Sequence, residues 1–395
     1  MAITGIFASH QGIVGERQQD FSATVLRINP TGDTPLLGMT AGMPKESASD
    51  VAFTWFEDIH QSGRQTIVSG GVSSTIVVDD SSIYTPNSVL LVEETGEHIF
   101  VISMAGNSLT VVRGLAGTSV VSVDNTMHTQ KIGNAFEEAS SRPASVTQQG
   151  APRTNYVQIF RNGWAISGTA KAVKYLTGSK LAQNKEMCAT YHAEDIERSF
   201  IWGKKTITTL NGKQFRMTDG LLTQIEQYGG DVRTANTGGA GQISRGAFED
   251  WMQSLFTYNV KGQPNERLAF CGNMALKVIN RMPWLDGQYQ FECSESKMGI
   301  KITEVVTPFG TLKLMTHAMM NENPVWTKEV YALHPGAIKK RVLRDTFPEN
   351  YDKSGAGVSG VDADEGAITS EMGIACGAAR VMGIYRNLTT AVKTT

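Results

Sequence analysis

Residues 179–202 (SKLAQNKEMCATYHAEDIERSFIW) form the longest helical pattern in the chain. Their apolar side chains fall near one stripe of a helix, and their acidic side chains lie mainly outside that stripe. The apolar set is Leu181, Cys188, Tyr191 and Phe200, and the acidic set is Glu186, Glu194, Asp195 and Glu197. A single helix of about 24 residues would span about 36 Å. The pattern therefore predicts one long amphipathic helix.

Strand patterns dominate on the N-terminal side of this helix. Residues 51–59 (VAFTWFEDI) are crowded with aromatic and β-branched side chains, which favours a strand. Three more strand patterns (SVLLVEE, HIFVISM and SLTVVRG) follow between residues 88 and 114, separated by short turns that contain Gly96 and Gly106. Strands at such regular spacing are typical of a small barrel or sandwich. We therefore expect a small all-β module at residues 86–133, inserted into the surrounding sequence.

The first 50 residues are expected to form an arm. Short helices are predicted at 20–28 and 35–40, because Pro30 ends the first pattern and Pro35 suits the first position of the second. The rest of this segment is rich in small and polar residues, so it can bury little surface of its own. The arm therefore needs another surface on which to pack.

Helices and strands mix from residue 219 onward. Ser244 is a favourable helix N-cap, and the apolar residues after it recur at the spacing of an amphipathic helix. Those apolar residues are Phe248, Trp251, Met252, Leu255 and Phe256. The further expectations are a helix at 274–282 ended by Pro283, strands at 267–271, 299–306, 311–316 and 329–333, a loop at 354–366 and a strand pair at 371–388. The mixture indicates the α+β class.

Charge and composition exclude several classes of protein. The 395 residues carry a formal net charge of -2, without the basic excess of proteins that wrap nucleic acid. The N-terminus lacks the pattern of a signal peptide, and no stretch approaches the about 18 apolar residues of a membrane span. The four cysteines (Cys188, Cys271, Cys293 and Cys376) are widely spaced, as is typical of free thiols in a reducing compartment. We expect a soluble protein made in the cytoplasm.

The residues that carry chemistry in other proteins are scattered here. Cys188 and His192 are four positions apart on the predicted long helix, beside Asp195, and are the best metal-binding candidate. Two ligands are too few for a zinc site, and no second pair is evident. A cysteine nucleophile would need a nearby base, and no local sequence resembles a nucleophile motif. A packed helix with a buried thiol is therefore favoured.

Two other motifs also have plainer interpretations. Residues 238–241 (GGAG) lack the Lys-Ser/Thr ending of a phosphate-binding Walker loop, so a flexible loop is favoured. Glu93 and Glu94, like Glu137 and Glu138, are adjacent, and adjacent residues of a strand point to opposite faces instead of facing each other across a reacting bond. The sequence therefore predicts that the protein is not an enzyme and has no catalytic, cofactor-binding or metal-binding residues.

One basic cluster stands out. Lys339, Lys340, Arg341 and Arg344 lie within six positions of one another. Such a cluster either contacts nucleic acid or an acidic neighbour, or forms a solvated surface. Both interpretations stay open at the level of sequence.

Six stretches resemble, in the same order, the major head proteins of tailed phages. The stretches are PLLGMT (35–40), FTWFEDI (53–59), NAFEEASSRP (134–143), NYVQIFRNGWAISGTAKAV (155–173), AEDIERSFIWGKK (193–205) and RLAFCGNMALKVIN (267–280). Together they span most of the chain, and none is a catalytic signature. The resemblance rests on the ordered set.

The resemblance implies the Hong Kong 97-type capsid fold, an α+β fold. Its parts would be an N-terminal arm, an extended loop, a peripheral domain with a long spine helix and an axial domain. The expected bounds are 1–50 for the arm, 51–165 for the extended loop with the β module at 86–133 inserted in it, 166–212 for the peripheral domain with the spine helix, 213–330 for the axial domain, and 331–395 for a C-terminal return to the peripheral domain.

The implied function is that of a major capsid protein, which self-assembles into the icosahedral head around the double-stranded DNA of a tailed phage. A shell protein of a cellular nanocompartment on the same fold, or a decoration or tail protein, is the alternative. The implied place is the virion head, after synthesis in the host cytoplasm. The chain opens directly on the arm, so we expect scaffolding to be a separate protein or absent, and no motif marks a covalent cross-link.

The implied partners are other copies of the chain, in hexamers and pentamers, with scaffolding, portal and decoration proteins as further candidates. Contact with packaged DNA is expected to be weak and non-specific, with Lys339, Lys340, Arg341 and Arg344 as its interior basic cluster. No cofactor and no membrane are expected. The candidate intersubunit contacts are Phe21, Trp55, Glu137, Glu138, Arg142, Arg153 and Arg161.

Overall fold

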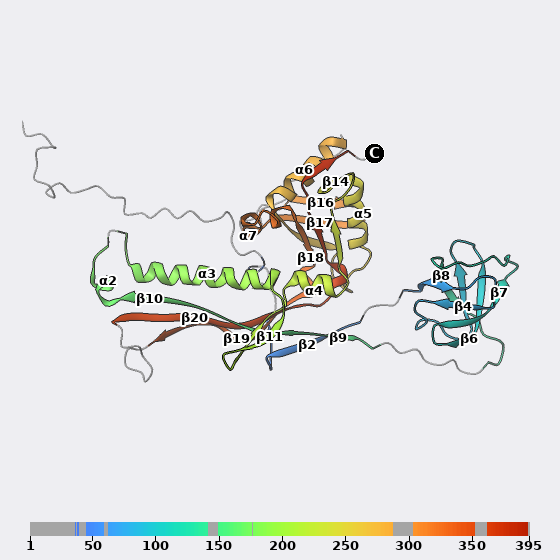
Figure 1. Ribbon diagram of the computed structural model, residues 1–395, viewed down its shortest axis with the longest axis horizontal. Coiled ribbons are helices and arrows are strands. Elements are labelled where there is room, and N and C mark those ends of the chain that lie inside the picture. The colour runs from blue at the N-terminus through green and yellow to red at the C-terminus, as the bar shows by residue number, and fades with distance from the viewer. Residues whose placement is uncertain are drawn as a thin grey trace, which may run out of the picture. The chain divides into compact units, whose positions relative to one another are not determined.

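The computed structural model describes residues 36, 38, 45–58, 62–140, 149–175, 177–286, 303–351 and 362–393. The chain divides into two compact units (Figure 1). The smaller unit is Phe56–Pro152, and the larger combines Met1–Trp55 with Arg153–Thr395. Each unit has buried apolar side chains of its own.

A closed β-barrel forms the smaller unit. Its strands follow one another around the barrel in the order β3-β4-β7-β6-β5-β8. Their bounds are β3 (Arg64–Ser69), β4 (Thr75–Val78), β5 (Ser88–Val92), β6 (His98–Ala105), β7 (Ser108–Leu115) and β8 (His128–Asn134). Alternate side chains of a strand point to opposite faces, so Ile67, Ile76, Leu90 and Ile99 fill the interior and are buried. The three strand patterns at 88–114 are confirmed as β5, β6 and β7.

The barrel begins earlier than the expected boundary at residue 86. β3 and β4 lie before that boundary and pair with β8 and β7. These pairings close the barrel between strands that are far apart in the sequence. The polar sequence of β3 (RQTIVS) gives little sign of such a role, which explains the misplaced boundary.

The long helix α3 (Lys180–Trp202) and a four-stranded sheet form one half of the larger unit. The strand order is β1-β19-β20-β10. The bounds are β1 (Glu46–Ser47), β10 (Gln158–Ser167), β19 (Ile338–Tyr351) and β20 (Ala363–Cys376). In Figure 1, α3 runs along β10 and β20, and Phe200 of α3 meets Phe160 of β10 edge-on at 6.2 Å between ring centroids. The predicted helix is confirmed, with the Ser179 hydroxyl as its N-cap.

A six-stranded sheet forms the other half. Its order is β13-β21-β18-β15-β17-β16. The bounds are β13 (Asp231–Thr234), β15 (Glu266–Cys271), β16 (Thr303–Thr307), β17 (Gly310–Thr316), β18 (Val330–Leu333) and β21 (Gly383–Arg386). Successive side chains of β15 enter different cores: Phe270 packs with α3 residues, whereas Ala269 and Cys271 pack with residues of α5 (Arg245–Leu255) and α6 (Asn273–Asp286). The sheet is therefore buried on both faces.

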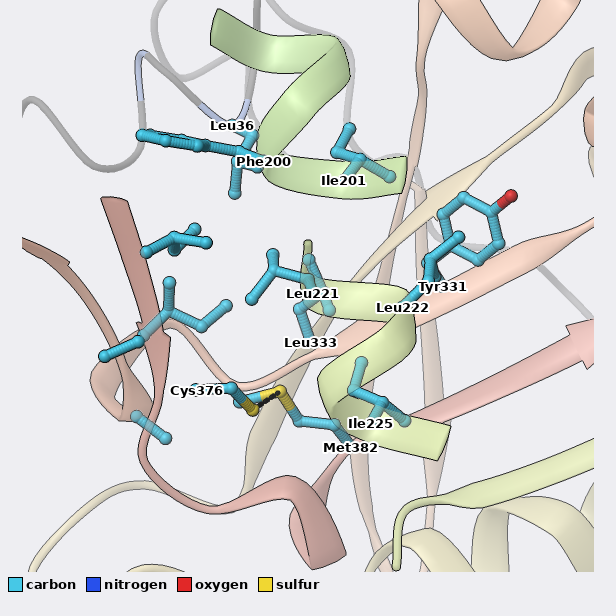
Figure 2. Close-up of a cluster of buried hydrophobic side chains, with 14 of the residues drawn as sticks. Leu36, Phe200, Ile201, Leu221, Leu222, Ile225, Tyr331, Leu333, Cys376 and Met382 are labelled. Atoms are coloured by element: carbon cyan, nitrogen blue, oxygen red, sulfur yellow. Dashed lines mark hydrogen bonds between the residues drawn. The ribbon is translucent and has the colours of Figure 1, made fainter. Parts of the chain in front are cut away.

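Figure 2 shows the core on the α3 side of this sheet. Phe200 and Ile201 of α3, Leu221 of α4 (Leu221–Gln227) and Tyr331 of β18 converge there. Leu36 lies beside Phe200 and is fully buried. Most other residues of this core lie more than a hundred positions later in the sequence. Leu36 is therefore part of the core of the larger unit.

Shorter elements complete the described chain. They are β2 (Ala52–Glu57), which pairs with β9 (Ala151–Tyr156); β11 (Thr206–Leu210), which pairs with β12 (Lys213–Met217); β14 (Gln242–Ser244), which pairs with β22 (Thr390–Val392); and the helices α2 (Gly168–Ala172) and α7 (Ala318–Glu322). Short 3-10 turns occur at Trp326–Lys328, Pro335–Ala337 and Ala379–Val381.

The end of α6 and the two helices predicted near the N-terminus differ in how far the structure tests them. The prediction that Pro283 ends a helix is wrong, because α6 continues to Asp286. Proline removes the donor of one i→i−4 hydrogen bond, and α6 ends three residues after it, within one turn. The predicted helix at 20–28 lies outside the described residues. The helix at 35–40 is described only at Leu36 and Gly38, and both are helical.

Candidate assembly surfaces

The candidate metal pair on α3 is engaged in hydrogen bonds within the chain. The thiol of Cys188 donates to the carbonyl oxygen of Asn162 at 3.3 Å. The two ring nitrogens of His192 lie 2.7 Å from Asn162 Oδ1 and 2.7 Å from Ser370 Oγ. Asn162 Nδ2 donates to Asp195 at 2.8 Å, and burial lowers the pKa of His192. These side chains tie α3 to β10 and β20.

One group of potential metal ligands occurs among the described residues, on the barrel: Glu93, Glu94 and His128. Arg64 Nε lies 2.8 Å from Glu93, and His128 Nδ1 lies 2.7 Å from Glu94. Both carboxylates thus already have partners on the barrel. The hydrogen bond from the His128 backbone N–H lowers the pKa of Glu94.

The glycine-rich loop at 238–241 is tied to the C-terminal part of the chain. The carbonyl oxygen of Gly241 accepts the backbone N–H of Thr389 at 2.8 Å and its hydroxyl at 2.6 Å. The side chain of Ser244 then caps α5 by accepting from the N–H of Ala247, as predicted. No helix among the described residues is long and apolar enough to cross a membrane.

A buried carboxylate on α3 forms a hydrogen bond with the backbone of Leu36. Glu197 is fully buried, and its Oε1 accepts the backbone N–H of Leu36 at 2.8 Å. The same oxygen lies 2.9 Å from Nε2 of His317, which is also fully buried. Glu197 thus joins α3, His317 before α7, and Leu36. The expectation that Glu197 lies outside the buried stripe of the helix is wrong.

The predicted intersubunit contacts are found in different surroundings. Trp55 is 9% exposed and packs in the core of the larger unit, so it offers little surface to a neighbour, whereas the adjacent Phe56 is 74% exposed. The guanidinium of Arg153 stacks over the ring of Tyr228 at 4.3 Å. Arg161 is exposed and pairs with Glu349 at 2.6 Å.

The remaining predicted contacts fall into two groups. Glu137 and Glu138 are exposed, and neither forms an ion pair with another described residue. Phe21 and Arg142 lie outside the described residues. Trp55 and Arg153 lie on the paired strands β2 and β9, whereas Arg161 lies on β10 of another sheet.

The four cations of the basic cluster point in different directions along β19. Lys339 and Arg341 both contact Glu46 of β1, at 2.6 and 2.5 Å, and Arg344 contacts Glu371 of β20 at 2.8 Å. Lys340 points to the opposite face and is buried, which lowers its pKa. The cluster therefore links strands of the sheet and is not a free basic patch.

A hairpin that the sequence reasoning missed projects from the larger unit. β11 and β12 pair through all five residues of each strand, and Asn211 and Gly212 between them both have positive φ (50° and 72°). Two such residues form the type I′ turn that Asn-Gly favours. Leu210, Phe215 and Met217 of this hairpin are 61%, 42% and 38% exposed. Asn-Gly between two β-prone runs was the available signal.

A model of the SU10 major capsid protein family matches residues 3–389 of this chain. The chain belongs to this family of capsid proteins. The major capsid protein of Pseudomonas phage PaMx41 is 26% identical over 386 residues, which cover 93% of this chain and 91% of that protein. Among solved structures, the capsid of a native GTA particle has a TM-score of 0.50 at 10% identity and covers 98% of this chain and 100% of its own. The capsid of the myovirus XM1 has a TM-score of 0.48 at 11% identity, with 97% and 99% covered.

The chain therefore has the Hong Kong 97-type capsid fold, as its resemblance to the major head proteins of tailed phages implied. It is a phage major capsid protein. The family match and the relative from phage PaMx41 favour this function over a nanocompartment shell or another virion component. Its place is the virion head. A structural family of this kind implies a protein that is not an enzyme.

Proposed function

We propose that this capsid protein assembles with copies of itself, as hexamers and pentamers, into the closed icosahedral head that encloses the double-stranded DNA of a tailed phage. The observation that supports this best is the exposure of large apolar side chains on regular elements of both units. Examples are Tyr191 on α3 (52%), Ile132 on the barrel (55%) and Leu210 on the β11–β12 hairpin (61%). Apolar side chains that gather on one face, as Leu210, Phe215 and Met217 do on the β11–β12 hairpin, mark an interaction site.

Repeated contacts explain how such surfaces build a shell. A closed shell needs heterologous contacts, in which different patches of neighbouring copies meet. Each contact contributes modestly, and many act together because every subunit is held at several sites. The short helix α2, which has no buried residue, also fits a surface completed by a neighbour.

The proposed parts of the subunit follow the family resemblance. α3 with the β1-β19-β20-β10 sheet would be the peripheral domain and the six-stranded sheet with α5 and α6 the axial domain. The β2–β9 ladder would belong to the extended loop that carries the barrel. β19 and β20 fit the expected C-terminal return to the peripheral domain, but the return is wrong for β18, β21 and β22, because β18 and β21 lie in the six-stranded sheet and β22 pairs with β14.

Contact with packaged DNA is proposed to be weak. The net charge is -2, and three of the four cations in the basic cluster are paired with carboxylates of the same chain. Tight, salt-sensitive binding requires many free cations on one face. Scaffolding, portal and decoration proteins remain proposed partners.

The test is assembly of the purified full chain. Electron microscopy after concentration into assembly buffer is expected to show closed shells, or rings of five and six subunits, and sedimentation should give the matching large species. A chain that stays strictly monomeric across these conditions would contradict the proposal. Genomic DNA inside particles isolated from infected cells is expected, and an enzyme cargo in its place would favour the nanocompartment.

A further inference from the structure

The β11–β12 hairpin has one apolar face. Directly paired residues of two antiparallel strands point to the same side. The pairs Thr206–Met217, Thr208–Phe215 and Leu210–Lys213 therefore share one face, and Ile207–Arg216 and Thr209–Gln214 share the other. The first face gathers Leu210, Phe215 and Met217, with Lys213 at its tip. We refer to it as the apolar hairpin face.

An ion pair ties one residue of the other face to the chain's own sheet. Arg216, on the opposite face, donates from its guanidinium to Glu371 of β20 at 3.1 Å, and both side chains are largely buried. The apolar hairpin face lies on the other side of the hairpin, and its three apolar side chains are exposed; Ile207 of the opposite face is 42% exposed as well, so it is Arg216 that is held to the sheet.

The hairpin is also strongly basic. Residues 203–218 (GKKTITTLNGKQFRMT) contain Lys204, Lys205, Lys213 and Arg216 and no acidic residue. Lys204 and Lys213 are exposed, and neither is paired with a carboxylate among the described residues. A partner for this surface therefore needs an apolar side chain with carboxylates beside it.

One described segment of the chain has that composition. Phe136 is 39% exposed and is followed directly by Glu137 and Glu138, both exposed. Among the exposed large apolar side chains of the described residues, it is the one followed directly by two exposed carboxylates. The backbone N–H of Ala135 donates to the carbonyl of Asn87 at 3.0 Å, which fixes the start of this segment to the barrel.

We propose that residues 135–140 of a neighbouring copy cover the apolar hairpin face. Phe136 packs against Phe215 and Met217, and the two glutamates pair with Lys213 and Lys204. The proposal rests on self-assembly as the function of the chain. In this contact, a segment of the smaller unit of one copy meets a hairpin of the larger unit of the next copy. The opposite charges of the two surfaces determine which segment binds the hairpin.

Charge reversal tests the pairing. One variant carries Lys204→Glu with Lys213→Glu, and a second carries Glu137→Lys with Glu138→Lys. All four positions are exposed, so circular dichroism and thermal melting of the free subunits should match the wild type. We expect loss of shells for each variant alone, because like charges then face each other. Lys261→Glu, at another exposed lysine, is the matched control and should assemble normally.

Mixing the two variants distinguishes a contact between copies from one within a copy. In an equal mixture, acidic hairpins can meet basic segments of the other variant around a ring of six, so six-membered rings should reappear; the two variants cannot alternate around a ring of five, so complete shells need not. Normal assembly of either variant alone, or no rescue in the mixture, would overturn the proposal. Wild-type chain that forms no shells would instead contradict the proposed function.

Oxidative footprinting gives a second readout that needs no variant. Met217 is 38% exposed in the subunit and should oxidise readily there. We expect strong protection of Met217 in wild-type shells, since the neighbouring segment would cover it. Equal oxidation of Met217 in free subunits and shells would overturn the proposal even where the variants fail to fold.

Discussion

His334 is a buried imidazole, and neither of its ring nitrogens has a hydrogen-bond partner among the described residues. Burial, together with the nearby guanidinium of Arg267, lowers the pKa of His334 from 6.5 to about 4. The folded state therefore keeps this ring neutral at a pH at which the unfolded chain binds a proton. This contribution to stability is complete above about pH 6.5 and is lost as the pH falls toward 4, by about 3 kcal/mol in total.

The measurement compares wild type with His334→Gln. Chemical denaturation at several pH values between 7.5 and 4 should show the wild type losing more unfolding free energy than the variant on acidification. Other groups titrate in both proteins, so the difference between the two curves isolates the histidine. Parallel curves would mean that His334 is already protonated, or solvated, in the folded state.

Trp251 is the largest fully buried side chain of the core around α5. Its ring meets Tyr385 edge-on at 5.3 Å, and its Nε1 donates to the carbonyl of Asp231 at 3.4 Å. We expect Trp251→Ala to cost about 3 to 5 kcal/mol in the free energy of unfolding, as for other buried aromatic residues. Val325→Ala, at a position 62% exposed, should change it little. A shift below about 1 kcal/mol for Trp251→Ala would show that α5 is packed differently.

Single residues also show where sequence reasoning ends. The N-cap Ser244 and the burial of Trp251 followed from spacing alone, because both depend on neighbours within one helix turn or two. Glu197 did not follow from spacing, because its partners Leu36 and His317 are 161 and 120 positions away. A carboxylate on an amphipathic helix is normally placed on the solvated side, and distant contacts override that expectation here.

At the scale of elements, a buried ion pair between Arg113 and Glu97 stabilises the barrel. The guanidinium of Arg113 lies 2.6 Å from Glu97 and also donates to the backbone carbonyls of Gly71, Ser73 and Val121. These bonds join the β3–β4 turn to the loop after β7. Breaking such a pair by removing one partner leaves a buried charge without compensation.

We expect Arg113→Met to destabilise the barrel by about 3 to 5 kcal/mol. Because the two units have separate cores, hydrogen exchange should accelerate in β3 to β8 and stay unchanged in α3 and α5. Replacing both partners, with Glu97→Leu added, should recover part of the loss. Faster exchange throughout both units would show that they unfold together.

Element prediction succeeded where a local pattern was strong. α3 and α5 have clear apolar stripes and serine caps, and β5, β6 and β7 are separated by glycine turns. β19 was missed because its sequence (IKKRVLRDTFPENY) contains a proline and many charges, and its register with β20 is interrupted by irregularities. Three of its basic side chains form ion pairs with carboxylates on β1 and β20. A run of charged residues that suggests a solvated surface in the sequence therefore connects strands in the structure. The sequence did not reveal the apolar hairpin face, because the exposure of Leu210, Phe215 and Met217 depends on how the folded chain covers them.

At the scale of the whole molecule, residues 1–30 are expected to act between subunits. The core of the larger unit already includes Leu36, so removal of residues 1–30 leaves that anchor and its bond to Glu197 in place. We expect the truncated chain to melt close to the wild type and to lose shell formation. Melting measures the subunit, and electron microscopy measures the assembly. An equal loss of both would contradict an intersubunit role.

The strand order of the six-stranded sheet has a consequence for synthesis. β21 lies between β13 and β18, in the interior of the sheet, and β22 completes the pair with β14. While residues 383–392 are still inside the ribosome, a central strand is missing and its neighbours have unpaired backbone groups. Folding of this half therefore waits until that segment has been released, although its first strand was translated about 150 residues earlier. A chain whose translation stops before residue 383 lacks this strand, so we expect such fragments not to complete this sheet and not to enter the particle.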